Sequence, residues 1–108
     1  MNKEREVAEK ALNFLTHTDA EIVQLERNFK DLEQVHKETK AAIIKTCDGA
    51  MELRKAEAET HETTKAAWKS AQDAWQEFKN LELRRKSAER RWEDWRSINA
   101  ARRQGQTV

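Results

Sequence analysis

The chain has 108 residues, of which 38% are charged and 37% hydrophobic, with only two glycines, no proline, one cysteine and a net charge of +1. This composition favours one mostly helical domain, and a single cysteine excludes an intrachain disulfide. Because no stretch approaches the roughly 20 apolar residues of a membrane span and no amino-terminal run resembles a signal peptide, we expect a soluble cytoplasmic protein without membrane contact.

Two helix-breaking signals divide the sequence into three expected helices. Thr18 and Glu21 have the spacing of a capping box, which predicts that one helix ends shortly before Thr18 and another begins at Asp19. Asp48 and Gly49 predict the second break, because glycine readily adopts the left-handed conformation that ends helices. The expected helices within this single domain of residues 1–108 therefore cover about 3–15, 19–47 and 50–103.

A seven-residue apolar repeat runs through these expected helices. Counted from Ala8, its a and d positions stay in one frame as far as Trp95, and such a frame keeps one stripe of each helix against a partner helix. The stripe is polar or small between Thr60 and Ala67, while other large apolar residues flank it: Leu12, Val35, Trp68, Trp75 and Ile98. The pattern predicts an all-α fold, a long-helix hairpin or coiled-coil bundle completed by self-association.

The expected helix lengths leave part of the last helix without a partner inside the chain. At 1.5 Å per residue, the helices over 19–47 and 50–103 would span roughly 43 Å and roughly 80 Å. The unpaired part would carry Trp92 and Trp95, and their exposure would be unfavourable in water. We therefore expect a homo-oligomer. The expected assembly or partner interface comprises Trp68, Trp75, Phe78, Leu81, Trp92 and Trp95.

Positive charge is concentrated toward the carboxyl end. Residues 79–103 contain nine basic and four acidic side chains, a net of +5, against a net of −4 over residues 1–78. A basic helix can neutralise phosphates, and tryptophans between arginines can stack on unpaired bases. The alternative is a solvated basic face beside packed a and d residues. The candidate nucleic-acid contacts are Arg84, Arg85, Arg90, Arg91, Arg96, Arg102 and Arg103.

The sequence specifies no catalytic or metal site. Cys47 has no histidine at a spacing that indicates a catalytic pair, and Lys65 occupies the position where a zinc-protease motif beginning at His61 needs a second histidine. Glu33 and His36 form one Glu-x-x-His motif, whereas di-iron bundles need two such motifs and further glutamates. We expect no enzymatic activity, cofactor or metal, a structural His36 and a buried Cys47.

The last charged helix ends with the stretch WRSINAARR, residues 95–103. This stretch resembles the carboxyl ends of small uncharacterised helical proteins of tailed phages and prophages. The resemblance implies an accessory protein in the host cytoplasm, beside replication or recombination proteins, and brings no catalytic residue. The leading hypothesis is a non-enzymatic helical protein that self-associates and docks on another protein, with the region of Trp92 and Trp95 central to assembly. The alternative is a DNA- or RNA-binding accessory protein that uses the basic carboxyl-terminal helix.

Overall fold

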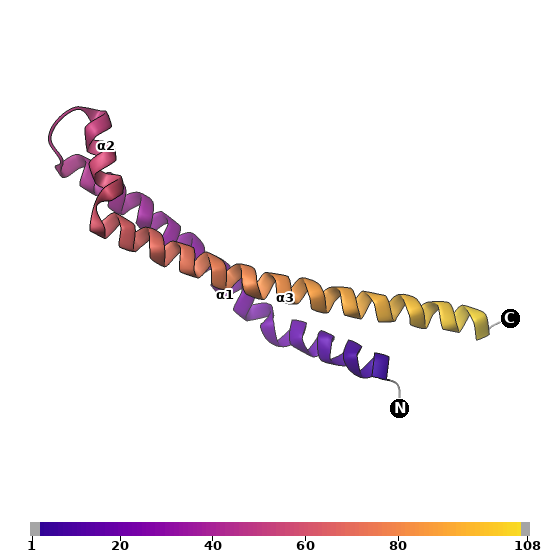
Figure 1. Cartoon of the computed structure of the whole chain (residues 1–108). Coiled ribbons are helices and arrows are strands. Elements are labelled where there is room, and N and C mark those ends of the chain that lie inside the picture. Colours follow the sequence, from indigo (N-terminus) through magenta and orange to yellow (C-terminus); the bar gives the residue numbers. More distant parts are fainter. Residues whose placement is uncertain (1–2, 107–108) are drawn as a thin grey trace. The chain divides into compact units, whose positions relative to one another are not determined.

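The computed structural model describes residues 3–106, and these residues form three α-helices and no strand. Helix α1 spans Lys3–Thr46, α2 spans Met51–Thr60 and α3 spans Glu62–Gln106 (Figure 1). The all-α fold expected from the sequence is confirmed. No helix in this described range is long and apolar enough to cross a membrane.

The chain divides into two compact units, and both long helices contribute residues to each. The terminal unit comprises Met1–Ile22 and Asn80–Val108, and the central unit comprises Val23–Lys79. In the terminal unit, the start of α1 and the end of α3 run antiparallel. Arg102 donates a hydrogen bond to Glu4 at 3.1 Å, near the chain ends, and Arg85 donates one to Asp19 at 2.6 Å.

The central unit contains the rest of α1, all of α2 and the start of α3. Phe29 of α1 stacks on Phe78 of α3, with ring centroids 6.5 Å apart and an angle of 9° between the ring planes. Toward the end of α1, Lys40 forms a 2.8 Å ion pair with Glu59 of α2. In each unit, α1 therefore packs against the helices that follow it in the chain, which confirms the expected long-helix hairpin.

The seven-residue stripe forms the buried face of α1 and α3. Every buried residue of these two helices lies at an a or d position: Ala8, Ala11, Thr18, Thr64, Ala71, Ala74, Phe78, Leu81 and Ala88. Alanine is the commonest of them, and none of the large apolar side chains among the described residues is completely buried. Because stabilisation by burial follows the apolar area removed from water, this seam contributes less than a core of large side chains would.

Helix α1 continues through Thr18 without the expected break. The Thr18 hydroxyl donates a 2.7 Å hydrogen bond to the Phe14 carbonyl within α1, instead of capping a new helix. The same hydroxyl accepts a 2.6 Å hydrogen bond from Arg85 of α3. Packing of a continuous stripe against α3 thus outweighs the local capping signal. The expected helix boundaries at 15 and 19 are wrong.

The expected helix over 50–103 is divided at His61. The backbone of His61 is extended, with φ −64° and ψ 137°, and its ring Nδ1 accepts a 3.2 Å hydrogen bond from the Thr63 backbone N–H. His61 therefore caps the amino terminus of α3, in the way a polar side chain satisfies an unpaired backbone donor. The polar stretch that begins at Thr60 was the only sequence signal for this break.

The loop between α1 and α2 contains the glycine that the sequence indicated. Gly49 has a φ of +107°, which glycine adopts easily and other residues adopt only with strain. The buried positions of α2 do not follow the seven-residue frame of α1 and α3. In α2 the buried residue is Ala58, one position after the expected Glu57, and Leu53 at an expected d position is 67% exposed. The seven-residue frame is therefore continuous in α1 and in α3, but not between them.

The carboxyl-terminal part of α3 has a partner within the chain. In the terminal unit it packs against the start of α1 as far as the ion pair between Arg102 and Glu4. This pairing is possible because α1 is one helix of 44 residues, close in length to the 45 residues of α3. The expected unpaired end of the last helix is therefore wrong, and it no longer supports self-association.

Candidate functional site

Two tryptophans of the expected interface are exposed on one side of α3 in the central unit. Trp68 and Trp75 keep 53% and 41% of their accessible surface. Each follows a buried a-position residue, Thr64 or Ala71, by four positions, so both rings flank the seam on the same side of α3. We call this pair of rings the tryptophan face. The flanking apolar positions noted in the sequence were the signal for it.

A hollow of about 360 Å³ adjoins Trp68 in the central unit. It is lined by His36, Lys40, Glu59, Thr64, Lys65 and Trp68. The Thr64 hydroxyl is buried and has no hydrogen-bond partner among the described groups, which costs free energy because the hydroxyl has left water without compensation. The helices are therefore incompletely packed next to the tryptophan face.

The other four residues of the expected interface pack within the chain to a greater extent. Phe78 and Leu81 are buried in the seam and keep 8% and 6% of their surface. Trp92 and Trp95 are half-buried in the terminal unit, where their rings stack with centroids 5.6 Å apart. Of the six residues, Trp68 and Trp75 thus offer the most aromatic area to a partner.

The seven arginines expected to contact nucleic acid differ in their surroundings. Arg85, Arg96 and Arg102 are paired with carboxylates, at 2.6, 3.1 and 3.1 Å. Their charge is neutralised locally. The remaining four form no ion pair within residues 3–106: Arg84, Arg90, Arg91 and Arg103.

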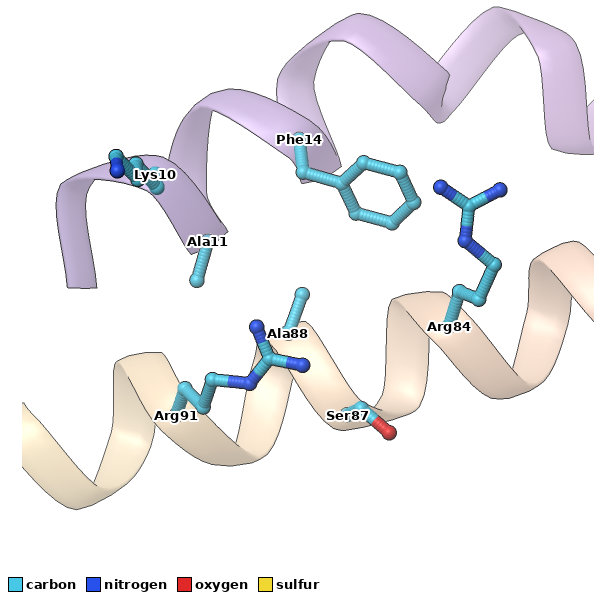
Figure 2. Close-up of a pocket in the computed structure, with 7 residues that line it drawn as sticks. All are labelled: Lys10, Ala11, Phe14, Arg84, Ser87, Ala88 and Arg91. Carbon is cyan, nitrogen blue, oxygen red and sulfur yellow. The ribbon is translucent and has the colours of Figure 1, made fainter. Parts of the chain in front are cut away.

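Two of these unpaired arginines line a hollow between α1 and α3 in the terminal unit (Figure 2). This basic groove has a volume of about 300 Å³ and is lined by Lys10, Ala11, Phe14, Arg84, Ser87, Ala88 and Arg91. The buried Ala11 and Ala88 point toward each other between the helices, and the Arg84 guanidinium lies 5.0 Å from the centroid of the Phe14 ring. The lining contains three cations and no carboxylate.

Sequence reasoning missed the groove residues that belong neither to the arginine set nor to the seven-residue stripe: Lys10, Phe14 and Ser87. Phe14 and Arg84 occupy equivalent positions of the repeat, and equivalent flanking positions lie on the same side of an antiparallel helix pair. The sequence therefore contained a signal that Phe14 and Arg84 lie on the same side of the helix pair. The expected break before residue 19 concealed it, because it left the first helix without an assigned partner.

The single cysteine lies just after α1. Cys47 is half-buried, so the expectation of a buried side chain is wrong. Burial, followed by a hydrogen bond to Glu57, raises the pKa of the Cys47 thiol. A thiol that stays protonated at neutral pH is a poor nucleophile.

Metal ligands do not cluster in the described part of the chain, where no group of three or more His, Cys, Asp and Glu side chains could hold an ion. His36 lines the hollow beside Trp68, and Glu33 forms an ion pair with Lys37 at 3.7 Å. No protein-family model, curated protein or solved structure matches this chain.

Proposed function

We propose that the protein is a non-enzymatic helical interaction protein that self-associates through the tryptophan face. The observation that carries the proposal is the exposure of Trp68 and Trp75 on one side of α3, beside a hollow with an unsatisfied Thr64 hydroxyl. A partner that covers this region would remove aromatic surface from water and fill the incompletely packed seam. Two hairpins joined in this way form a four-helix bundle.

Burial of the exposed tryptophan area roughly offsets the cost of association, so the expected dimer is weak. A tryptophan side chain has about 200 Å² to bury, and covering half of it contributes roughly 2.5 kcal/mol at about 25 cal/mol per Å². Four half-exposed rings in a dimer then contribute roughly 10 kcal/mol, comparable to the association cost of about 4–15 kcal/mol. We therefore expect the dimer to dissociate on dilution.

The charges beside the tryptophan face favour a second copy of this chain as the partner. Lys40, Glu59 and Lys65 line the adjoining hollow, so the surface carries both signs of charge. A two-fold interface brings the same patch of each subunit together. Because Lys40 and Glu59 already pair within each chain, only Lys65 of these three is left without an ion pair among the described residues, and like-charge repulsion across the axis is small. The net charge of +1 adds little long-range repulsion between copies.

Replacement of both rings tests the proposal. The double variant Trp68→Ala/Trp75→Ala is expected to be monomeric at concentrations where the wild type is dimeric, with unchanged helix content by circular dichroism. Leu83→Ala is the matched control, because Leu83 is a 60% exposed apolar residue of α3 outside the tryptophan face. A dimer that survives the double variant, or one that Leu83→Ala disrupts equally, would place the interface elsewhere.

A further inference from the structure

The basic groove gathers three positive charges that have no carboxylate partner. Lys10, Arg84 and Arg91 line it, and none of them forms an ion pair with another described residue. Neighbouring cations differ in this respect, since Arg5 pairs with Glu9 at 3.0 Å and Arg85 is bound at 2.6 Å to a carboxylate of α1. Arg90 and Arg103 of the terminal unit are also unpaired within the described range, so the distinguishing feature of the groove is that three unpaired cations line one hollow.

We propose that the basic groove binds a phosphate group. Arg84 and Arg91 lie seven residues apart on α3, about 10.5 Å along the helix, and Ser87 lies between them on the same face. The Arg84 guanidinium extends toward Phe14 of α1 and the Arg91 guanidinium lies near Ala88, so an anion in the hollow would lie between them, and Lys10 contributes a charge from α1 (Figure 2). The anion would accept charge-assisted hydrogen bonds from the guanidinium and ammonium groups.

Physical features of the groove favour an anion over water alone. Three like charges line one hollow, and a bound phosphate would attract each of them and offset their mutual repulsion. The contact between Arg84 and the Phe14 ring holds the guanidinium over the groove, so less side-chain entropy is lost on binding. Ala11 and Ala88 are small, and they leave space at the point where the helices meet.

The recognised chemistry is the phosphate oxyanion, which a nucleic acid strand and a small phosphorylated molecule both carry. Two probes separate these sources: inorganic phosphate by calorimetry, and a fluorescently labelled single-stranded oligodeoxynucleotide by anisotropy. The tryptophan face belongs to the central unit, so these measurements do not depend on the proposed dimer.

A pair of variants with equal charge loss tests the site. Arg84→Gln/Arg91→Gln removes both arginines of the groove, and Arg90→Gln/Arg103→Gln removes two unpaired arginines of α3 that do not line it. We expect about tenfold or more weakening in the first variant, as for loss of charge-assisted hydrogen bonds, and less than about twofold in the second. Lys10→Gln, an exposed change on α1, tests the groove independently if the arginine variant loses helix content.

Each outcome is decisive. Binding of the oligonucleotide that is lost in the groove variant supports the proposal with a nucleic acid as the source, and the dependence of log K on log salt should then flatten by about 1.4 for two lost contacts. Binding of inorganic phosphate alone, lost in the same variant, supports it with a small ligand. If neither probe binds the wild type, or if both double variants weaken binding equally, the proposal is wrong.

Discussion

The Arg85 guanidinium of α3 lies 2.6 Å from a carboxylate oxygen of Asp19 on α1. The same side chain donates hydrogen bonds to the Leu15 carbonyl at 2.9 Å and to the Thr18 hydroxyl at 2.6 Å. One arginine at an a position thus joins three groups of the opposite helix, and only 15% of its side chain is exposed. A polar residue at such a position fixes the register of paired helices.

Replacement of Arg85 is therefore expected to destabilise the fold. Arg85→Met keeps much of the apolar length but removes the hydrogen bonds, and we expect a loss of about 1.5–3 kcal/mol in the free energy of unfolding. Most of this comes from the part-buried bonds to Leu15 and Thr18, because the Asp19 side chain is 69% exposed and its ion pair is screened by water. Urea unfolding followed by circular dichroism measures the loss. Arg90→Met is the control. An equal loss of unfolding free energy in that variant would show that the hydrogen bonds of Arg85 do not stabilise the fold.

Replacing each of the two glycines with alanine should change the stability of the protein in opposite directions. Gly49→Ala forces an L side chain into a φ of +107°, and we expect a destabilisation of about 1–2 kcal/mol. Gly105 lies within α3 with open space around its Cα, so Gly105→Ala should stabilise the helix by at most about 1 kcal/mol. Thermal unfolding of the two variants gives the comparison. Equal melting temperatures would show that the loop at Gly49 is not held in this conformation.

Acid should weaken the contact between α1 and α2. A hydrogen bond from Lys40, together with its charge, lowers the pKa of Glu59 below its ordinary 4.5. A carboxyl group whose pKa is lower in the folded state contributes stability that is fully present above the unfolded pKa and is lost as pH falls through the folded pKa. NMR titration of the Glu59 carboxyl should show the lowered pKa, and Lys40→Gln should raise it again. Lys45→Gln is the control. If the pKa of Glu59 is the same in Lys40→Gln as in the wild type, Lys40 and Glu59 do not pair in solution.

The Cys47 thiol should react slowly with alkylating reagents at neutral pH. Burial and the hydrogen bond to Glu57 raise its pKa, so a smaller fraction is thiolate than in the unfolded chain. Iodoacetamide should modify the native protein more slowly than the protein in urea at pH 7. Glu57→Gln should increase the native rate, whereas Glu62→Gln should not. A native rate equal to that in urea would contradict the raised pKa.

The buried stripe of the long helices could be predicted because burial in paired helices follows a seven-residue period. Ala8, Ala74 and Leu81 were placed correctly by that frame alone. The position of Thr18 inside a continuous helix could not be predicted in this way, because its hydroxyl accepts a hydrogen bond from Arg85, 67 residues later in the chain. Local capping signals carry no information about such a partner.

The candidate sites were predictable to different extents. Exposure of Trp68 and Trp75 follows from their flanking positions, whereas the basic groove combines arginines of α3 with Lys10 from the opposite end of the sequence. Charge counting identified Arg84 and Arg91 but also residues that the fold pairs with carboxylates. The resemblance of residues 95–103 to phage proteins stays a prediction, and so does an accessory role during infection.

Sedimentation equilibrium of the wild-type protein over a range of micromolar concentrations tests self-association most directly. The proposed dimer predicts a mass that approaches twice the 12.7 kDa of one chain and falls toward the monomer on dilution. The tryptophan fluorescence maximum should shift to shorter wavelength over the same range, as water leaves Trp68 and Trp75. A mass of 12.7 kDa at every concentration, with an unchanged emission maximum, would contradict the account.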